Sequence, residues 1–181
     1  MMGSAAARRA DGNLRLGMTV FLGTWVMLFA ALFLAYAVVR LQAVAWPPPS
    51  LPRLPRALPG VATLLLVASS LALRARLALP RRLAMAMALG VLFVALQASV
   101  WRTALTVGLT PGSGTYASVF FALTIFHALH VACGLVLLMV VAIRAGTGRI
   151  GPHSGALWLA TTFWDFVTVV WMVIYGAVFW L

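Results

Sequence analysis

Five long apolar runs, separated by short polar or proline-rich stretches, make up most of the chain. We place them at about residues 16–40, 58–75, 80–107, 116–143 and 156–181. A helix needs about 20 mainly apolar residues to cross the hydrocarbon core of a bilayer, and each run is close to that length or longer. Arg74 and Arg76 cut the second run short. The pattern predicts an all-α fold, an integral membrane bundle of five transmembrane helices.

The composition supports this fold class. Hydrophobic residues make up 64% of the 181 positions, charged residues make up 8%, and the mean hydropathy is +1.07. A typical soluble domain is only about half apolar, so this chain cannot cover its apolar surface with polar groups. The first run is too long for a signal-peptide core, and we interpret it as a retained helix. We expect a basic tail over 1–15 and a single transmembrane domain over 16–181.

The basic residues favour one orientation in the membrane. The net charge of +11 comes from thirteen arginines against Asp11 and Asp165. One side carries most of them, in the tail and in the loops after the second and fourth runs: Arg8, Arg9, Arg15, Arg74, Arg76, Arg81, Arg82, Arg144 and Arg149. The positive-inside rule then places the N-terminus in the cytoplasm and the C-terminus outside. These positions indicate topology and contact with lipid headgroups, and we expect no nucleic-acid partner.

A proline-rich stretch, WPPPSLPRLPRALP at 46–59, joins the first two runs. Proline removes a backbone donor and fixes φ, so this stretch is incompatible with a helix or an inner strand. We expect a stiff, extended linker that packs over neighbouring helix ends on the outer face. Trp46 begins it and lies near the expected outer membrane boundary, where tryptophan is enriched.

Two histidines in the fourth run are the main candidates for chemistry. His127 and His130, in TIFHALHVACG at 124–134, are three residues apart, so a helix presents both on one face. Ionisable residues at bilayer depth are costly and suggest function. Same-face spacing does not let the pair ligate opposite faces of one haem iron, and a non-haem metal would have only Cys133 and Asp165 as further ligands. We expect no catalytic, metal or cofactor site on this chain, and we interpret Cys133 as a packing residue.

A polar contact between helices is the alternative for these histidines. Asp165 lies about nine residues, or about 14 Å, into the fifth run, and His127 lies about 16 Å below the outer end of the fourth. In a hydrocarbon core of about 30 Å the two side chains would be level. We hypothesise that Asp165 pairs with His127, directly or through Thr124 or a water molecule. Gln97, a buried amide in the third run, is expected to bond to a neighbouring helix.

Five motifs in a common order resemble subunit III of the haem–copper terminal oxidases. They are LRLGMTVFLGTWVMLF, WPPP followed by LPGVATLLLVASS, LGVLFVALQAS, GTYASVFFALTIFHALHVACG and WDFVTVVWMVIY. Any one alone would be weak, whereas the ordered set is specific. The two N-terminal helices of the seven-helix members are missing. The resemblance therefore implies the five-helix form found in quinol oxidases and in several bacterial cytochrome c oxidases.

This resemblance implies a non-catalytic subunit of a respiratory complex in the bacterial inner membrane. The family subunit packs against oxidase subunit I, with subunit II in the same complex, and holds phospholipids. It supports proton uptake and resistance to turnover inactivation, while haem and copper lie on the partner subunits. The chain is thus expected to belong to an oxidoreductase complex without being its catalytic part. Candidates for contact with lipid or partner subunits are Arg15, Trp25, Trp46, Trp164 and Trp171.

The chain departs from the family pattern at several polar positions. Trp25 stands where the family has a membrane carboxylate, and Val100 stands where it has a second acid. In the last helix the family sequence His-Phe-Val-Asp is Asp165-Phe-Val-Thr168 here. Two other functions stay open at this point. One is an accessory protein of nitric oxide reduction from the same family, and the other is a stand-alone small transporter, which the absence of internal repeats and of a polar lining disfavours.

Overall fold

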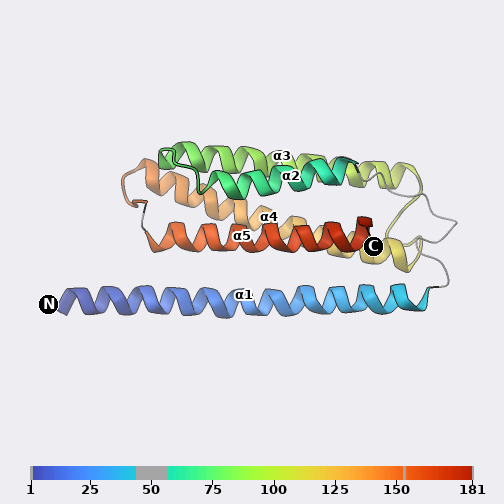
Figure 1. Ribbon diagram of the computed structural model, residues 1–181, viewed down its shortest axis with the longest axis horizontal. Helices are drawn as coiled ribbons and strands as arrows, with labels where there is room; N and C mark the ends of the chain where they lie inside the picture. The colour runs from blue at the N-terminus through green and yellow to red at the C-terminus, as the bar shows by residue number, and fades with distance from the viewer. Residues whose placement is uncertain (1, 44–56, 153, 181) are drawn as a thin grey trace.

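The computed structural model describes residues 2–43, 57–152 and 154–180. These ranges form five α-helices, namely α1 (Met2–Gln42), α2 (Ala57–Ala72), α3 (Leu79–Thr106), α4 (Thr115–Gly146) and α5 (Gly155–Tyr175). The final turn, η1 (Gly176–Trp180), is π-helical. No strand occurs in the described ranges, so the all-α prediction is confirmed. The helices run along one common direction as an elongated bundle (Figure 1).

The last helix lies at the centre of this bundle. α5 contacts α1 on one side and α2 on the other, and it runs along α4. The α2–α3 hairpin lies opposite α1, and α3 closes the bundle by packing on α4 (Figure 1). Within the described residues α1 packs on α4 and α5, and Tyr36 donates to the carbonyl of Ala177 in η1 at 2.7 Å, so most of the apolar surface of α1 faces outward.

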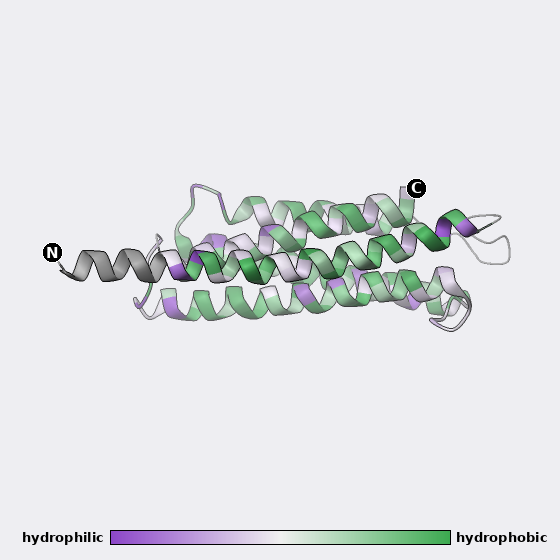
Figure 2. Cartoon of the chain, turned by 90° about the horizontal axis from the view of Figure 1, so that it is seen from below, coloured by the Kyte–Doolittle hydropathy of each residue, from purple (hydrophilic) through white to green (hydrophobic). Residues whose placement is uncertain are grey.

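Among the described residues, four helices are long and apolar enough to cross a membrane, at Gly12–Gln42, Leu79–Thr106, Thr115–Gly146 and Gly155–Trp180. Apolar residues run along them and most hydrophilic residues lie near their ends (Figure 2). The chain is therefore a multi-pass membrane protein. The predicted span over 58–75 is shorter in the structure, because α2 ends at Ala72 and its 16 residues reach only about 24 Å.

The first helix begins well before the predicted span. Helical backbone starts at Met2 rather than at residue 16, so the basic stretch continues the membrane helix instead of forming a separate extended tail. The predicted linker at 46–59 lies almost wholly outside the described residues, and only its last three positions fall in α2. The division into a tail and one transmembrane domain stays a prediction.

Glycines end the third and fourth helices sharply. Gly108 and Gly148 have φ values of +83° and +68°, a left-handed conformation that glycine adopts without steric cost. In each case the next residue donates its N–H to a carbonyl five positions back at 2.9 Å, from Leu109 to Ala104 and from Arg149 to Arg144. This is the Schellman pattern, which satisfies carbonyls at a helix end. It lets the chain reverse within a few residues and return as the next helix.

Candidate functional site

His127 lies in the middle of α4 with its imidazole completely buried. Its ring is tilted against Trp171 of α5, with 5.0 Å between ring centroids, and meets Phe93 of α3 edge-on at 5.9 Å. Neither ring nitrogen has a hydrogen-bond partner among the described residues. Aromatic contacts, each worth about 0.5–1.5 kcal/mol beyond the buried area, therefore hold this side chain in place.

His130, one turn further along α4, faces a different helix. The centroid of its ring lies 4.0 Å from that of Trp25 and 5.1 Å from that of Phe29, and both of these residues are on α1. Nδ1 lies 2.5 Å from the carbonyl oxygen of Phe126. A carbonyl can only accept, so Nδ1 carries the proton and donates it there. Nε2 is buried without a partner in the described part of the chain. The two histidines, although three residues apart, serve separate helix contacts.

The hypothesis that Asp165 hydrogen bonds directly to His127 is wrong. Asp165 forms a salt bridge with Arg74, which lies in the turn after α2. Arg74 donates from Nη1 to Oδ1 at 2.9 Å and from Nη2 to Oδ2, and Ser70 donates its hydroxyl to the same Oδ1 at 2.5 Å. This bonding raises the pKa of Arg74, chiefly through the hydrogen bond to Asp165. The carboxylate therefore ties α5 to the end of α2, not to α4.

The register of α4 against α5 explains this difference. A Cβ atom on Gly134 would lie 2.8 Å from Cε3 of Trp164, so these two residues are level with each other. His127, seven residues earlier on α4, is then level with Trp171. Asp165 lies six residues from Trp171, or about 9 Å along the helix axis. The depth estimate assumed helices that end at the edge of a core of about 30 Å, whereas α4 has 32 residues and extends beyond it.

Of the two other residues predicted to make polar contacts, Thr124 is hydrogen bonded and Gln97 has no partner among the described residues. Thr124 accepts a hydrogen bond from Nε1 of Trp101 at 3.1 Å and donates its own proton to the carbonyl of Phe120 at 2.8 Å. It links α3 to α4 and does not reach Asp165. Gln97 is completely buried, and its amide oxygen and nitrogen have no partner in the described ranges. The expected bond from Gln97 to a neighbouring helix is not formed there.

Tryptophan indoles supply the polar links between helices. Trp164 donates to the hydroxyl of Ser69 at 2.9 Å, and Ser69 donates to the carbonyl of Ala86 at 2.7 Å, so one chain of bonds joins α5, α2 and α3. Trp171 donates to Thr63 of α2 at 2.9 Å. Each receiving hydroxyl donates a hydrogen bond to a backbone carbonyl, Ser69 to Ala86 and Thr63 to Pro59, and its oxygen can therefore accept from the indole. Trp164 and Trp171, predicted as lipid or interface candidates, are buried inside the bundle instead.

Two helical glycines make room for the central indole. Cβ atoms at Gly90 and Gly134 would lie 2.7 Å and 2.8 Å from ring atoms of Trp164, which is therefore held between α3 and α4. Sequence reasoning missed both glycines, and it also missed Arg74 as the partner of Asp165. A signal was present, because small residues within apolar runs mark close helix contacts in membranes.

The remaining candidates are Arg15, Trp25, Trp46 and Cys133. The Arg15 guanidinium lies 5.3 Å from the ring centroid of Trp158, a cation–π contact between α1 and α5. Trp25 packs on His130 and its indole nitrogen is buried without a partner in the described chain. Trp46 lies outside the described residues. Cys133 is exposed on α4, contrary to the expectation of a core position.

Histidine, cysteine and acidic side chains of the described residues form no group of three or more that could hold a metal. The two histidines are engaged in separate ways, His127 between aromatic rings and His130 through its Nδ1–H bond. The arrangement joins helices and does not direct ligands toward one centre.

Residues 2–181 match the family model of cytochrome c oxidase subunit III. The chain belongs to the cytochrome c oxidase subunit III family. It is 34% identical to "Cytochrome c oxidase subunit 3" of Synechocystis sp., over 98% of this chain and 80% of that protein. It is 32% identical to "Probable cytochrome c oxidase subunit 3" of Mycobacterium tuberculosis, over 91% of this chain and 86% of the relative. The subunit of Sus scrofa is 32% identical, over 93% of this chain and 69% of its own length.

Membership of the subunit III family confirms the resemblance seen in the five motifs. It also confirms the prediction of an accessory subunit of a haem–copper oxidase, and it favours neither nitric oxide reduction nor transport. The departures now have structural positions. Trp25, which the resemblance sets at the place of a family carboxylate, packs on His130, and Asp165, which it sets at the place of a family histidine, pairs with Arg74.

Proposed function

We propose that this chain is the non-catalytic subunit III of a respiratory haem–copper oxidase, that it packs mainly on subunit I in a complex that also contains subunit II, and that it holds phospholipid. The family match along residues 2–181 carries the proposal. The bundle is consistent with a structural role, because its buried polar side chains make contacts between helices, such as the hydrogen bond from Trp164 to Ser69. Haem and copper then belong to the partner subunits, and this chain binds no cofactor.

The inner membrane of a bacterium is the proposed location, with the N-terminus in the cytoplasm and the C-terminus outside. The charge distribution supports this orientation. The end of the bundle at the α2–α3 and α4–α5 turns carries Arg74, Arg76, Arg81, Arg82, Arg144 and Arg149, together with Arg15 of α1. At the opposite end the described residues include Arg40 and Arg102. The excess of arginine marks the cytoplasmic side.

Affinity purification tests the assignment to an oxidase. The chain, tagged at one end and extracted from its native membrane in mild detergent, is expected to bring down larger subunits with a visible haem spectrum and oxygen-consuming activity. A tagged membrane protein of similar size from the same cells is the control. A haem-free preparation, with the oxidase recovered intact elsewhere, would overturn the proposal. A complex depleted of the chain is expected to lose activity faster during turnover.

Cysteine labelling tests the orientation. Cys133→Ser removes the single cysteine, and Ala78→Cys and Thr110→Cys then place one thiol at each end of the bundle, since both positions are exposed. A membrane-impermeant maleimide is expected to label position 110 in intact spheroplasts and position 78 only after lysis. The reverse pattern would contradict the proposed orientation.

A further inference from the structure

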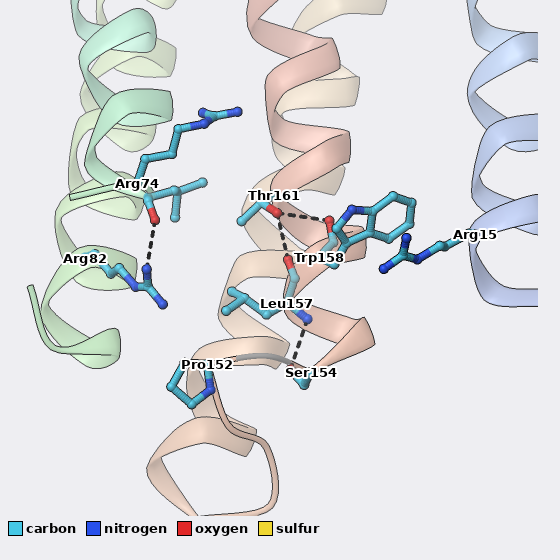
Figure 3. Close-up of a pocket in the computed structure, with 9 residues that line it drawn as sticks. Arg15, Arg74, Arg82, Pro152, Ser154, Leu157, Trp158 and Thr161 are labelled. Carbon is cyan, nitrogen blue, oxygen red and sulfur yellow. Dashed lines mark hydrogen bonds between the residues drawn. The ribbon is translucent and has the colours of Figure 1, made fainter. Parts of the chain in front are cut away.

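Polar contacts attach α1 to the rest of the bundle near both ends of its membrane-spanning part. Near one end the Arg15 guanidinium lies 5.3 Å from the ring centroid of Trp158 (Figure 3). Near the other end Tyr36 donates to the carbonyl oxygen of Ala177 at 2.7 Å. Trp25 lies about ten residues, or about 15 Å, from each of these contacts. It is therefore in the middle of the spanning part, where the bilayer supplies no water to replace a missing hydrogen bond.

Trp25 and His130 each bury a ring nitrogen that has no partner among the described residues. These nitrogens are Nε1 of Trp25 and Nε2 of His130. An indole nitrogen can only donate. Nδ1 of His130 carries the ring proton, because it donates to the Phe126 carbonyl at 2.5 Å, so Nε2 of the neutral ring can only accept. An unpaired donor and an unpaired acceptor therefore belong to the same contact between α1 and α4.

The two nitrogens are near enough for one small ligand to bond to both. The ring centroids lie 4.0 Å apart, and the ring planes make an angle of 87°. A ring nitrogen lies about 1–2 Å from the centroid of its ring system, so the nitrogens are at most about 7 Å apart. They do not bond to each other in this arrangement. A water molecule that bonds to both at about 2.9 Å joins nitrogens that are about 4–6 Å apart, so the geometry allows one bridging water.

Aromatic rings surround this contact and favour water over a larger ligand. The ring centroid of Phe21 lies 5.8 Å from that of Trp25, and the ring centroid of Phe29 lies 5.1 Å from that of His130. Neither phenyl ring offers a hydrogen-bonding atom. A side chain of another subunit would have to displace these rings to reach the buried nitrogens, whereas one water molecule would not. Buried waters in proteins typically bond to two to four polar groups that otherwise have no partner.

We propose that one water molecule is bound between Trp25 and His130, where it accepts a hydrogen bond from Nε1 of Trp25 and donates one to Nε2 of His130. The water satisfies both nitrogens and joins α1 to α4 in the middle of the membrane. α1 is then held by polar contacts at three depths, with this site between the contacts at its two ends. The site is internal to the chain and does not depend on the complex that the chain serves.

A density map of the purified complex, at a resolution that shows ordered water, tests the site directly. A peak within hydrogen-bonding distance of both nitrogens is expected in the wild type, and Trp25→Phe should remove it. The absence of a peak between the two rings, or a direct hydrogen bond from Nε1 to Nε2, would overturn the proposal. The wild-type map decides even where a variant fails to assemble.

A double-mutant cycle measures whether the two nitrogens act together. Trp25→Phe keeps an aromatic ring and removes the donor, and His130→Leu removes the acceptor. Each is expected to lower the ratio of retained to released chain, after heating the complex in detergent, by about threefold to tenfold, the effect of one neutral hydrogen bond. The double variant should lose no more than the more damaging single variant, because either change already breaks the bridge. Losses that multiply would show that the nitrogens are not linked, and would overturn the proposal.

Trp158→Phe is the matched control for Trp25→Phe. The same exchange on α5 keeps a ring beside Arg15, and the Trp158 nitrogen is not among the buried atoms without a partner in the described chain. This variant is expected to be retained as the wild type is. Equal losses in the two variants would assign the effect to ring area rather than to a hydrogen bond, and would overturn the proposal. Haem content is recorded in parallel, and a haem-free preparation that shows the water and the coupling would remove the oxidase assignment while supporting this site.

Discussion

The indole of Trp164 lies directly against the backbone of α4 at Gly134, where an added Cβ would come within 2.8 Å of Cε3. Gly90 of α3 makes the same close approach from another side of the ring. The indole nitrogen meanwhile donates to Ser69 of α2. One side chain of α5 thus contacts three other helices, α2, α3 and α4. Trp164 is therefore the position on which the packing of the bundle depends most.

Gly134→Ala is expected to destabilise the chain by about 1–3 kcal/mol, the usual cost of overpacking a tight core. Gly23→Ala on α1 is the matched control, because a Cβ there meets nothing within 4 Å and the gain in helix propensity is the same. The thermal midpoint of the purified complex, followed through retention of this chain, measures the difference. In a Trp164→Ala background the additional cost of Gly134→Ala should vanish, and an undiminished cost would show that another neighbour resists the methyl group.

The hydropathy of the chain is sufficient to predict where the helices lie in the sequence. It does not predict which residues of neighbouring helices lie at the same depth in the membrane. Apolar runs predict each long helix because the bilayer requires continuous apolar length, and the bounds agree except where α1 and α4 extend past the membrane core. The height of His127 relative to Asp165 depends on side-chain packing between helices. That packing is set by Gly134 against Trp164, a contact between residues thirty positions apart. An error of six residues in this register was enough to assign the wrong partner.

The partner of Asp165 was missed for a related reason. Arginine near a helix end usually extends toward headgroups, so Arg74 was used only to end the second span and to set topology. In the structure its guanidinium turns back over the last turn of α2, where it also donates to the Ser70 carbonyl at 3.2 Å. Asp165 supplies the counter-charge. Only the three-dimensional positions show that the two are within reach.

The two substitutions that break the Arg74–Asp165 salt bridge are expected to differ in how much stability they cost. Arg74→Gln leaves a carboxylate at membrane depth with Ser70 as its remaining hydrogen-bond donor, and it should cost up to about 3 kcal/mol. Asp165→Asn leaves an arginine whose side chain is already 58% exposed and can turn to water, so it should cost less than about 1 kcal/mol. The double variant should be more stable than Arg74→Gln alone, since it buries no lone charge.

Detergent-solubilised complexes of these three variants, compared by the temperature at which this chain dissociates, measure the asymmetry. Arg76→Gln is the control for Arg74→Gln, because it lowers the net charge by the same amount without touching the pair. If Asp165→Asn proved as costly as Arg74→Gln, the stability would come from the hydrogen-bond geometry of the pair rather than from an unpaired buried charge.

His127→Leu is expected to be neutral or to stabilise the chain by about 1 kcal/mol. Leucine fills a similar volume and removes two buried nitrogens that have no partner in the described residues, each costing about 1–3 kcal/mol. The loss of the contact with Trp171 offsets part of that gain. His127→Ala should instead cost more than 2 kcal/mol, because it leaves a cavity in a fully buried position.

Chain retention in the purified complex, after heating in detergent, distinguishes the two substitutions. Equal damage by leucine and alanine would show that His127 makes a hydrogen bond within the assembled oxidase. The same comparison with Gln97→Leu and Gln97→Ala tests the second buried group without a partner.

The contact between Trp25 and His130 predicts that an acid can be restored on α1. The ring of Trp25 lies 4.0 Å from that of His130, whose Nε2 is buried without a partner in the described chain. A carboxyl group in place of the indole, as in Trp25→Glu, would therefore lie beside Nε2 of His130, which can accept its hydrogen bond. Val26 is the next residue along α1, and its side chain is 51% exposed and directed outward. A glutamate there, as in Val26→Glu, would find only lipid.

Insertion of an unpaired acid near the centre of a membrane helix costs about 2.5–3.5 kcal/mol. Trp25→Glu is accordingly expected to insert and assemble at close to the wild-type level, whereas Val26→Glu should lower assembly severalfold. Haem-normalised amounts of this chain in the purified oxidase measure both. Adding His130→Leu should remove the tolerance of Trp25→Glu, because the glutamate then loses its partner. If instead both glutamates assemble equally well, the polar niche around His130 is not what accepts the charge, and α1 must be reachable by water or by a basic group of the neighbouring subunit.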